Sequence, residues 1–233
     1  MVNYNGKNVV VTGASGGMGV VLCKQLAEQG AKLSLCSNRA EDLEALVAEV
    51  SKMTEVFAKV VDITNEEEVA AFFNESYEKF GEYHAMANLA GVSIPSKIPE
   101  TEESVYDTIM DVNVKGTFLA GKYFAQKAAK PSIIVNIGSA AAKTANANAP
   151  LYCTAKAAVN MLSKTMLLQM GPQDIRVTTI NPGGADTPFW GTRTVDKTKL
   201  MQAEEVVEVI MFALCSSPKI QIHDIFFESK ARF

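Results

Sequence analysis

The stretch NVVVTGASGGMG, residues 8–19, decides the fold that we expect for this chain. Its β-branched run Val9–Val11 predicts a buried strand, and a helical pattern begins directly after the glycines. Gly13 would permit a tight turn, and glycines at 17 and 19 would let backbone N–H groups approach a pyrophosphate at the positive helix N-terminus. This context favours dinucleotide binding over the purely structural alternative, a strand–helix turn that binds no ligand.

Apolar strands and amphipathic helices alternate along the remaining sequence. Strands are expected at 8–12, 32–36, 55–61, 84–89, 133–137, 175–180 and 220–227, and helices at 20–29, 41–51, 65–80, 102–129, 150–170 and 203–215. Continuous apolar strands are typical of a parallel sheet that is covered on both faces. We therefore predict an α/β, doubly wound Rossmann-type fold with a seven-stranded parallel sheet, helices on both faces, and a single domain over residues 1–233.

Composition narrows the function classes. The chain has 233 residues, 48% of them hydrophobic, and a net charge of −4, which offers no basic surface for nucleic acid. The first residues lack the apolar core of a signal peptide, and no apolar run is long enough to span a membrane. Four scattered cysteines and only two histidines predict neither a disulfide nor a metal site. We expect a cytoplasmic protein with no membrane, nucleic-acid or metal partner.

A tyrosine and a lysine four residues apart share one helix face in YCTAK, residues 152–156. A fixed cation favours the phenolate form of a neighbouring tyrosine, so such a pair could exchange a proton with a carbonyl or an alcohol. The spacing alone proves little, because Tyr123 and Lys127 form a second pair of the same kind.

The motif TGxxxGxG at residues 12–19, together with Tyr152-xxx-Lys156, resembles the short-chain dehydrogenase/reductase family. The similarity covers residues from about 7 to 227, and the glycine spacing resembles the single-domain oxidoreductases of that family. The resemblance implies an NAD(P)-dependent enzyme that transfers a hydride between nicotinamide and a small carbonyl or secondary alcohol. It also implies a homo-oligomer, a dimer or tetramer, that packs through the two long helices.

Four residues match the catalytic set of the family. Ser139 follows the strand 133–137 at the carboxyl edge of the expected sheet, thirteen residues before Tyr152. No serine stands comparably ahead of Tyr123, so the context selects Tyr152 as general acid or base. By resemblance, Lys156 would lower the pKa of Tyr152 together with oxidised nicotinamide and hold the nicotinamide ribose. Ser139 would stabilise charge on the substrate oxygen, and Asn113 would hold a helix kink and a proton-relaying water.

The end of the second strand bears on the choice of cofactor. Ser37 occupies the position where an acid would bind the ribose 2′-hydroxyl of NAD, and Asn38 and Arg39 follow. A hydroxyl, an amide and a guanidinium suit a 2′-phosphate, so NADP(H) is favoured. NAD(H) stays possible, because Gly16 stands where NADP-dependent members often carry Arg, Lys or Ser, and Arg39 could be a solvated charge.

The resemblance assigns the remaining cofactor contacts to loops that follow the strands. Asp62 matches an adenine-contacting acid but could also be a turn residue, and Asn88-Leu89-Ala90-Gly91 matches a family motif with Leu89 in place of Asn. The segment 181–187 matches one that contacts the nicotinamide carboxamide. The implied cofactor-binding set is Gly13, Ser15, Gly17, Met18, Gly19, Ser37, Asn38, Arg39, Asp62, Ile63, Asn88, Ala90, Gly91, Tyr152, Lys156, Pro182, Gly183, Ala185 and Thr187.

Residues 188–202 are expected to form a short polar lid over the substrate, with Phe189 and Trp190 as its aromatic cover. A short lid and small neighbours of Ser139 suggest a modest substrate. A competing hypothesis is a sensor or scaffold that binds NADP(H) without turnover, for which the substitution Leu89 and the nearby His84 leave room.

Overall fold

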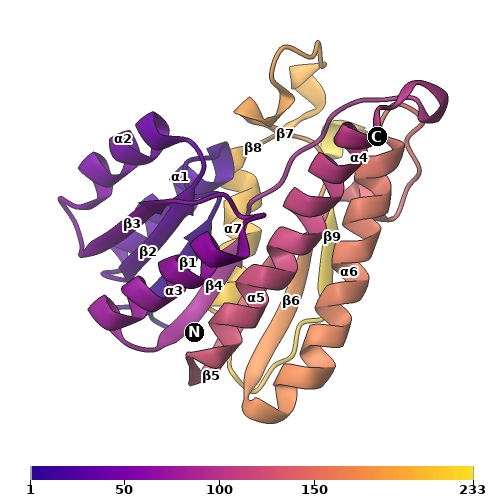
Figure 1. Ribbon diagram of the computed structural model, residues 1–233. Coiled ribbons are helices and arrows are strands. Elements are labelled where there is room, and N and C mark those ends of the chain that lie inside the picture. Colours follow the sequence, from indigo (N-terminus) through magenta and orange to yellow (C-terminus); the bar gives the residue numbers. More distant parts are fainter. Residues whose placement is uncertain (1, 233) are drawn as a thin grey trace.

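The computed structural model describes residues 2–232 and contains a seven-stranded sheet in the order β3-β2-β1-β4-β5-β6-β9 (Figure 1). The strands are β1 Asn8–Thr12, β2 Lys32–Ser37, β3 Val56–Val60, β4 Tyr83–Asn88, β5 Ala128–Ile137, β6 Ile175–Pro182 and β9 Asp224–Phe227. Every neighbouring pair is parallel, which confirms the predicted doubly wound α/β fold. The outermost positions of the expected range, 1 and 233, lie outside the described residues.

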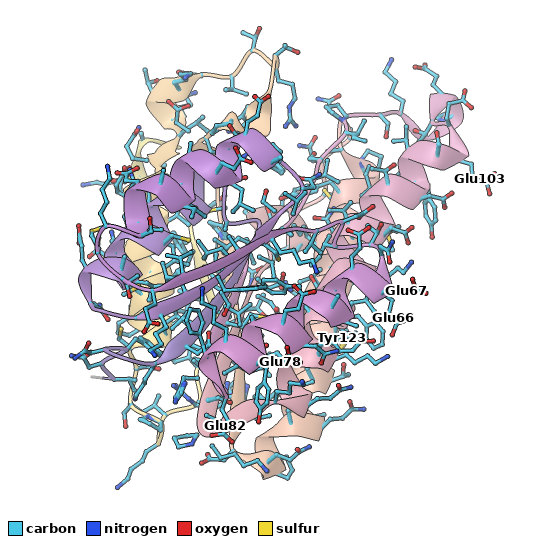
Figure 2. All side chains as sticks on the ribbon, turned by 60° about the vertical axis from the view of Figure 1, so that its left-hand side comes forward. Glu66, Glu67, Glu78, Glu82, Glu103 and Tyr123 are labelled. Atoms are coloured by element: carbon cyan, nitrogen blue, oxygen red, sulfur yellow. The ribbon has the colours of Figure 1, made fainter. Side chains whose placement is uncertain are left out.

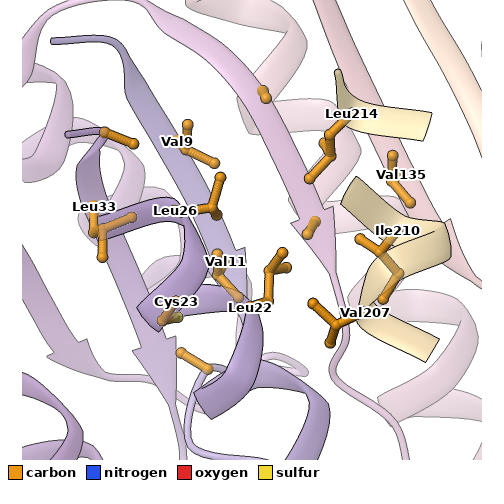
Figure 3. Close-up of a cluster of buried hydrophobic side chains, with 14 of the residues drawn as sticks. Val9, Val11, Leu22, Cys23, Leu26, Leu33, Val135, Val207, Ile210 and Leu214 are labelled. Atoms are coloured by element: carbon orange, nitrogen blue, oxygen red, sulfur yellow. The ribbon is translucent and has the colours of Figure 1, made fainter. Parts of the chain in front are cut away.

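Helices cover both faces of this sheet. The first face carries α1 Gly17–Glu28, α2 Ala40–Val50 and α7 Ala203–Leu214, and the second carries α3 Glu66–Phe80, α5 Gly116–Gln126 and α6 Pro150–Met170. On β1, Val9 and Val11 pack against Leu22 of α1 (Figure 3), whereas Val10 belongs to the cluster on the other face. Successive strand residues point to opposite faces, so both must be apolar, which explains the unbroken apolar strands.

The strand order reverses beside β1, which pairs with β2 on one side and with β4 on the other. Connections from β1 and β4 therefore leave in opposite directions. In open parallel sheets such a switch point creates a crevice at the carboxyl ends of the strands. The glycine-rich turn at residues 13–16 follows β1 directly into this crevice.

The long helix expected at 102–129 is interrupted in the structure. It consists of α4 Glu103–Met110, a π-helical turn η2 Asp111–Lys115, and α5. Asn113 in η2 donates hydrogen bonds from Nδ2 to the carbonyl oxygens of Ile109 and Val92, both at 2.8 Å. This side chain competes with the backbone for an acceptor, which is a physical cause of irregular helix geometry.

The fifth strand is longer than expected because it begins at Ala128 and includes Pro131. Proline cannot donate a ladder hydrogen bond, so strands rarely contain it away from edges and bulges. The register between β4 and β5 shifts at this point, which accommodates the irregular start. β9, in contrast, covers only the second half of the expected range 220–227.

The sequence patterns missed a second, two-stranded sheet of β7 Ala185–Asp186 and β8 Met201–Gln202. Each strand has two residues, too few for a periodic pattern. Pairing of these strands holds the two ends of the lid, residues 188–202, side by side; the lid lies at the top of Figure 1. Short helical turns complete the fold: η1 Ile98–Glu100, η3 Ala140–Ala142, η4 Gly171–Gln173, η5 Pro188–Trp190, η6 Lys197–Lys199 and η7 Lys230–Arg232.

Among residues 2–232, no helix is both long enough and apolar enough to cross a bilayer. The same residues contain no group of three or more His, Cys, Asp or Glu side chains arranged to hold a metal ion.

Candidate active site

A cavity of about 400 Å³ lies at the carboxyl ends of β1, β2 and β4. It is walled by the glycine turn, by the segments that follow β2, β3 and β4, and by the start of the lid. Of the predicted cofactor residues, its lining includes Gly13, Gly17, Met18, Gly19, Ser37, Asn38, Arg39, Asp62, Ile63, Ala90, Gly91 and Thr187. Residues from five separate segments are thus brought to one crevice beside the topological switch point.

The glycines of the turn are required by the packing of the protein itself. Gly13 has a φ of +62°, and a Cβ there would lie 2.8 Å from the backbone nitrogen of Ala90. A Cβ at Gly19 would collide with the carbonyl oxygen of Ala14, and one at Gly17 would lie 2.9 Å from Cβ of Thr187. The expected tight turn at Gly13 is present, and the missing side chains also let the neighbouring segments close around the crevice.

The start of α1 is suited to an external anion. Its N-cap is Gly16, which makes no side-chain capping bond, and its first turn contains no acid. The first turns of α2, α3 and α7, in contrast, each carry at least two acids. A helix N-terminus attracts negative charge, and here no side chain of its own supplies that charge. The N-terminus of α1 therefore fits the pyrophosphate of a dinucleotide.

A hydroxyl pair and a guanidinium form the wall of the cavity at the end of β2. The hydroxyl oxygens of Ser15 and Ser37 are 2.6 Å apart. Arg39 donates from Nη2 to the carbonyl oxygen of Ser15 at 2.5 Å, and its Nη1 lies 2.9 Å from Oδ2 of Asp42. Ser15 is buried beneath this wall and does not line the cavity. The arrangement holds a cation at the cavity wall, although Asp42 neutralises part of its charge.

Asp62 fits both sequence-based interpretations, since it lines the cavity and also shapes a turn. Its Oδ1 accepts hydrogen bonds from the backbone nitrogen of Thr64 at 2.9 Å and from the Thr64 hydroxyl at 2.8 Å. The carboxylate is thereby fixed at the end of β3, next to Ile63.

Tyr152 and Lys156 lie one turn apart on α6, beside the end of β5. Nζ of Lys156 is 5.7 Å from the centre of the Tyr152 ring and donates a 2.8 Å hydrogen bond to the carbonyl oxygen of Ile137. Lys156 is only 4% exposed. Desolvation lowers the pKa of its ammonium to about 8.

Burial raises the pKa of Tyr152 to about 12, while a hydrogen bond with Ser139 and the positive charge of Arg193 act to lower it. The sequence-based expectation joined Lys156 with oxidised nicotinamide as the cations that lower this pKa. The positive charge of Arg193 acts on this pKa in the same direction, which the sequence did not indicate. Arg193 lies in the lid, far from Tyr152 in sequence, so no local pattern could have identified it.

Ser139 is placed at the carboxyl end of β5 as predicted. Its backbone nitrogen donates to Oδ1 of Asn181 at 3.1 Å, and its Oγ accepts from the backbone nitrogen of Ala141 at 3.1 Å. The turn η3 packs against α6, which brings the Ser139 hydroxyl into hydrogen-bonding contact with Tyr152. A phenol and a hydroxyl therefore converge on one point at the sheet edge.

Asn113 completes the cluster from the π-helical turn. Both Nδ2 hydrogen bonds are used by backbone carbonyls, whereas its Oδ1 is buried and has no hydrogen-bond partner among the described residues. A Cβ on Gly91 would lie 2.9 Å from this Oδ1 and 3.3 Å from Nζ of Lys156. The space above Gly91 thus adjoins the side chains of both Asn113 and Lys156. The Oδ1 atom of Asn113 is an unused hydrogen-bond acceptor beside this space, close to the ammonium of Lys156.

The second tyrosine–lysine pair lies elsewhere. The hydroxyl of Tyr123 donates to Oε1 of Glu66 at 3.0 Å, and Figure 2 shows both side chains on the same side of the molecule. Nζ of Lys127 lies 4.4 Å from the centre of the Tyr77 ring. Surface packing and an acid on α3 therefore account for this pair, as the sequence context predicted.

The other predicted cofactor residues support the crevice without lining it. Asn88 accepts a 2.5 Å hydrogen bond from the Thr12 hydroxyl and contacts Asn136, so it ties β1, β4 and β5 together. Pro182 ends β6, and the backbone nitrogen of Gly183 donates to Phe227 at 2.8 Å. The carbonyl oxygen of Ala185 accepts from Nε1 of Trp190 at 2.7 Å, which anchors the lid.

The sequence also missed several residues of the cavity wall. Thr108 and Val112 come from α4 and η2, and Val92 from the loop after β4. Thr108 and Val112 are four residues apart, so the only indication in the sequence was that both would lie on one face of a helix. In the lid, the Phe189 ring lies 5.8 Å from the Tyr152 ring, so the expected aromatic cover lies next to Tyr152.

Comparisons with known proteins agree with this geometry. Residues 7–198 match the family model described as short chain dehydrogenase. An uncharacterized oxidoreductase of Staphylococcus saprophyticus is 30% identical over 97% of this chain and 98% of its own length.

Two solved structures show the same fold. A short chain dehydrogenase from Burkholderia cenocepacia in complex with NADP has 22% identity and a TM-score of 0.92, with all of both chains covered. An alcohol dehydrogenase from Thermococcus sibiricus complexed with 5-hydroxy-NADP has 23% identity and a TM-score of 0.88, with 97% of each chain covered.

Proposed function

Because this chain belongs to the short-chain dehydrogenase family, we propose that it is an NADP(H)-dependent oxidoreductase acting on a small carbonyl compound or secondary alcohol. NAD(P)-dependent dehydrogenase or reductase activity is the family's chemistry. The observation that carries the proposal is the convergence of Ser139, Tyr152 and Lys156 at the carboxyl edge of the sheet, next to the crevice at the start of α1. We take residues 1–233 as one oxidoreductase domain.

In this proposal the nicotinamide supplies the hydride, and the protein's own residues handle the proton and the charge. Tyr152 keeps its proton at neutral pH, because burial raises its pKa to about 12, and donates it to the substrate oxygen as reduction proceeds. The Ser139 hydroxyl hydrogen-bonds to the same oxygen and stabilises the charge that develops there. In alcohol oxidation the proton moves in the opposite direction, so Tyr152 accepts it from the substrate hydroxyl and acts as the base.

Lys156 and Asn113 would resupply the proton to Tyr152. The ammonium of Lys156 has a pKa lowered to about 8, close to neutral pH, where a group exchanges protons most effectively. The unused Oδ1 of Asn113, which adjoins Lys156 across Gly91, would accept a hydrogen bond from a relaying water. Lys156 would also bind the nicotinamide ribose.

The preference for NADP(H) rests on the wall at the end of β2. The guanidinium of Arg39 and the hydroxyl of Ser37 line the cavity where a 2′-phosphate would lie, and no acid takes the place of Ser37. NAD(H) is the alternative that one contact favours, namely the pairing of Arg39 with Asp42, which weakens its charge. The NADP in two structural relatives agrees with the first choice.

We further propose a cytoplasmic homo-oligomer, a dimer or tetramer. Phe118 on α5, and Met161 and Leu168 on α6, leave 47%, 61% and 77% of their surface exposed. Large apolar side chains gathered on adjacent helices are typical of an interface. A monomer mass from small-angle scattering would contradict the oligomer.

A substrate screen tests the proposed function. The purified protein is assayed with small ketones, oxo acids and alcohols, with NADPH or NADH, and compared with Tyr152→Phe and with Tyr123→Phe as the matched control. We expect turnover with NADPH that falls by about 10²–10⁴-fold in Tyr152→Phe and is unchanged in Tyr123→Phe. NADPH binding without turnover of any substrate would favour the sensor hypothesis, and tighter binding of NADH would favour the NAD alternative.

A further inference from the structure

Arg193 is the one charged side chain of the lid without an opposite charge beside it. Lys197 pairs with Asp186 at 3.0 Å and Lys199 with Asp196 at 3.9 Å. Throughout residues 2–232, no carboxylate forms an ion pair with Arg193.

Backbone carbonyls hold the Arg193 side chain in place. Its Nε donates to the carbonyl oxygen of Trp190 at 2.8 Å, and its Nη2 donates to that of Phe189. A guanidinium has five N–H donors, so these two contacts leave donors free for a ligand. Because these contacts already fix the guanidinium, binding of a ligand would cost little additional side-chain entropy.

The guanidinium also packs on the two aromatic rings of the lid, one of which contacts Tyr152. Its central carbon lies 5.4 Å from the ring centre of Phe189 and 5.0 Å from that of Trp190. Phe189 in turn lies 5.8 Å from the Tyr152 ring. The positive charge is therefore one aromatic ring away from the phenol, and it is close enough to act on the pKa of Tyr152.

Arg193 is one of the residues that line a second cavity of about 400 Å³. It shares Thr187 and Pro188 with the cofactor crevice, so the two spaces adjoin at the start of the lid. Arg193 and Lys197 both line it, with Asp186 as the only acid of the lining, so its wall carries a net positive charge. Such a wall attracts an anionic group and repels a cationic one.

We propose that Arg193 binds a carboxylate of the substrate, so that the preferred substrate is a small oxo acid, or the matching hydroxy acid, rather than a neutral ketone. The inference rests on the proposed function and names its substrate class. A carboxylate matches the planar fork of the guanidinium, and charge-assisted hydrogen bonds of this kind are about twice as strong as neutral ones. The carbonyl of the same molecule would reach Tyr152 and Ser139 alongside the Phe189 ring.

Matched substrate pairs test this assignment. Oxo acids of three to six carbons and their amides are assayed with NADPH against the wild type, Arg193→Met and Arg193→Lys, with Lys199→Met as the control for a paired lid cation. We expect the wild type to prefer each acid over its amide. We expect Arg193→Met to lose about 10–100-fold in kcat/KM on the acids, mainly through KM, with less than a threefold loss on the amides. Arg193→Lys should recover part of the loss.

A binding measurement provides a readout that is independent of turnover. Calorimetric titration of the protein saturated with NADP⁺ compares butyrate with butyramide, and we expect butyrate to bind more tightly in the wild type but not in Arg193→Met. Equal losses on acids and amides, equal binding of the two probes by the wild type, or a weakened affinity of Arg193→Met for NADPH would overturn the inference. Turnover of amides without preference for acids would overturn it while leaving the proposed function intact, whereas absence of all turnover would overturn the proposed function and the substrate class with it.

Discussion

Nζ of Lys156 is held 2.8 Å from the carbonyl oxygen of Ile137, and no carboxylate among residues 2–232 forms an ion pair with this buried ammonium. Burial of an unpaired cation destabilises the native state, and this destabilisation falls where the proposed reaction would exchange a proton. The pKa lowered to about 8 is the sign of this destabilisation, and it leads to a prediction about stability.

The stability contributed by Lys156 should depend on pH. An unfolded lysine has a pKa near 10.5, so between pH 8 and 10.5 the unfolded chain binds more protons than the native one and native stability rises with pH. Below pH 8 both states carry the proton, and the buried charge destabilises the native state in full. Relative to Lys156→Met, the wild type should gain about 1 kcal/mol between pH 7 and pH 9, at about 1.36 kcal/mol per pKa unit. Urea unfolding of both proteins at each pH measures this difference, and a constant difference would contradict the lowered pKa.

Gly91→Ala should impair proton transfer while the fold is retained. The new Cβ would lie 2.9 Å from Oδ1 of Asn113 and 3.3 Å from Nζ of Lys156, so it would push both groups apart and displace any water between them. We expect kcat to fall on the order of 10–100-fold at saturating cofactor. Gly171→Ala is the matched control, because its Cβ would meet only Cδ1 of Leu167, at 3.7 Å. Equal activity of the two variants would show that the space above Gly91 has no role.

Two substitutions at the end of β2 should change cofactor affinity in opposite directions. Arg39→Gln removes the guanidinium at the cavity wall, and we expect NADPH to bind about 10–100-fold more weakly with little change for NADH. Asp42→Asn removes the carboxylate that lies 2.9 Å from Nη1 of Arg39, and it should strengthen NADPH binding by a few fold. Fluorescence titrations with both cofactors provide the measurement. An equal effect of Arg39→Gln on NADH would assign Arg39 to a part of the dinucleotide that both cofactors share.

Asn136→Ala should destabilise the protein without touching the catalytic groups. The side chain is 1% exposed, and its Nδ2 donates to the Ser163 hydroxyl at 2.9 Å while its Oδ1 accepts from Asn88 at 3.4 Å. Removing it leaves buried partners unsatisfied, which costs about 1–3 kcal/mol for each group. Ser163→Ala should cost less, because Nδ2 of Asn136 also contacts the sulfur of Met166. Thermal and urea unfolding distinguish the two, and a loss smaller for Asn136→Ala than for Ser163→Ala would contradict the network.

Local patterns identified the elements of the fold wherever the chain follows one period. The strand at Val9–Val11 reads as apolar at every position because both of its faces are buried. The prediction failed where a tertiary contact interrupts the period. Asn113 bonds to Val92 of a distant loop and converts part of the expected 102–129 helix into a π-helical turn. The first half of β5 was not predicted, because it contains Pro131. In the structure, a register shift between β4 and β5 accommodates this irregular segment.

Sequence alone identified the residues that would carry the proposed chemistry. The order strand, glycine turn, helix and the spacing of Tyr152 and Lys156 are local properties, because a turn requires its glycines and a helix face is set by its period. Choosing between Tyr152 and Tyr123 already required context, and the structure gives its cause: one phenol meets Ser139 at the sheet edge, and the other bonds to Glu66.

Only the tertiary structure decided the pKa values of these groups. Desolvation raises the pKa of Tyr152 and lowers that of Lys156, and burial is a property of the packed chain that no short stretch encodes. The approach of Arg193 to the phenol joins two segments about forty residues apart through the Phe189 ring, which is tilted against that of Tyr152. Electrostatic effects act through space, so the sequence names the charged groups, while the fold determines which of them act on one another.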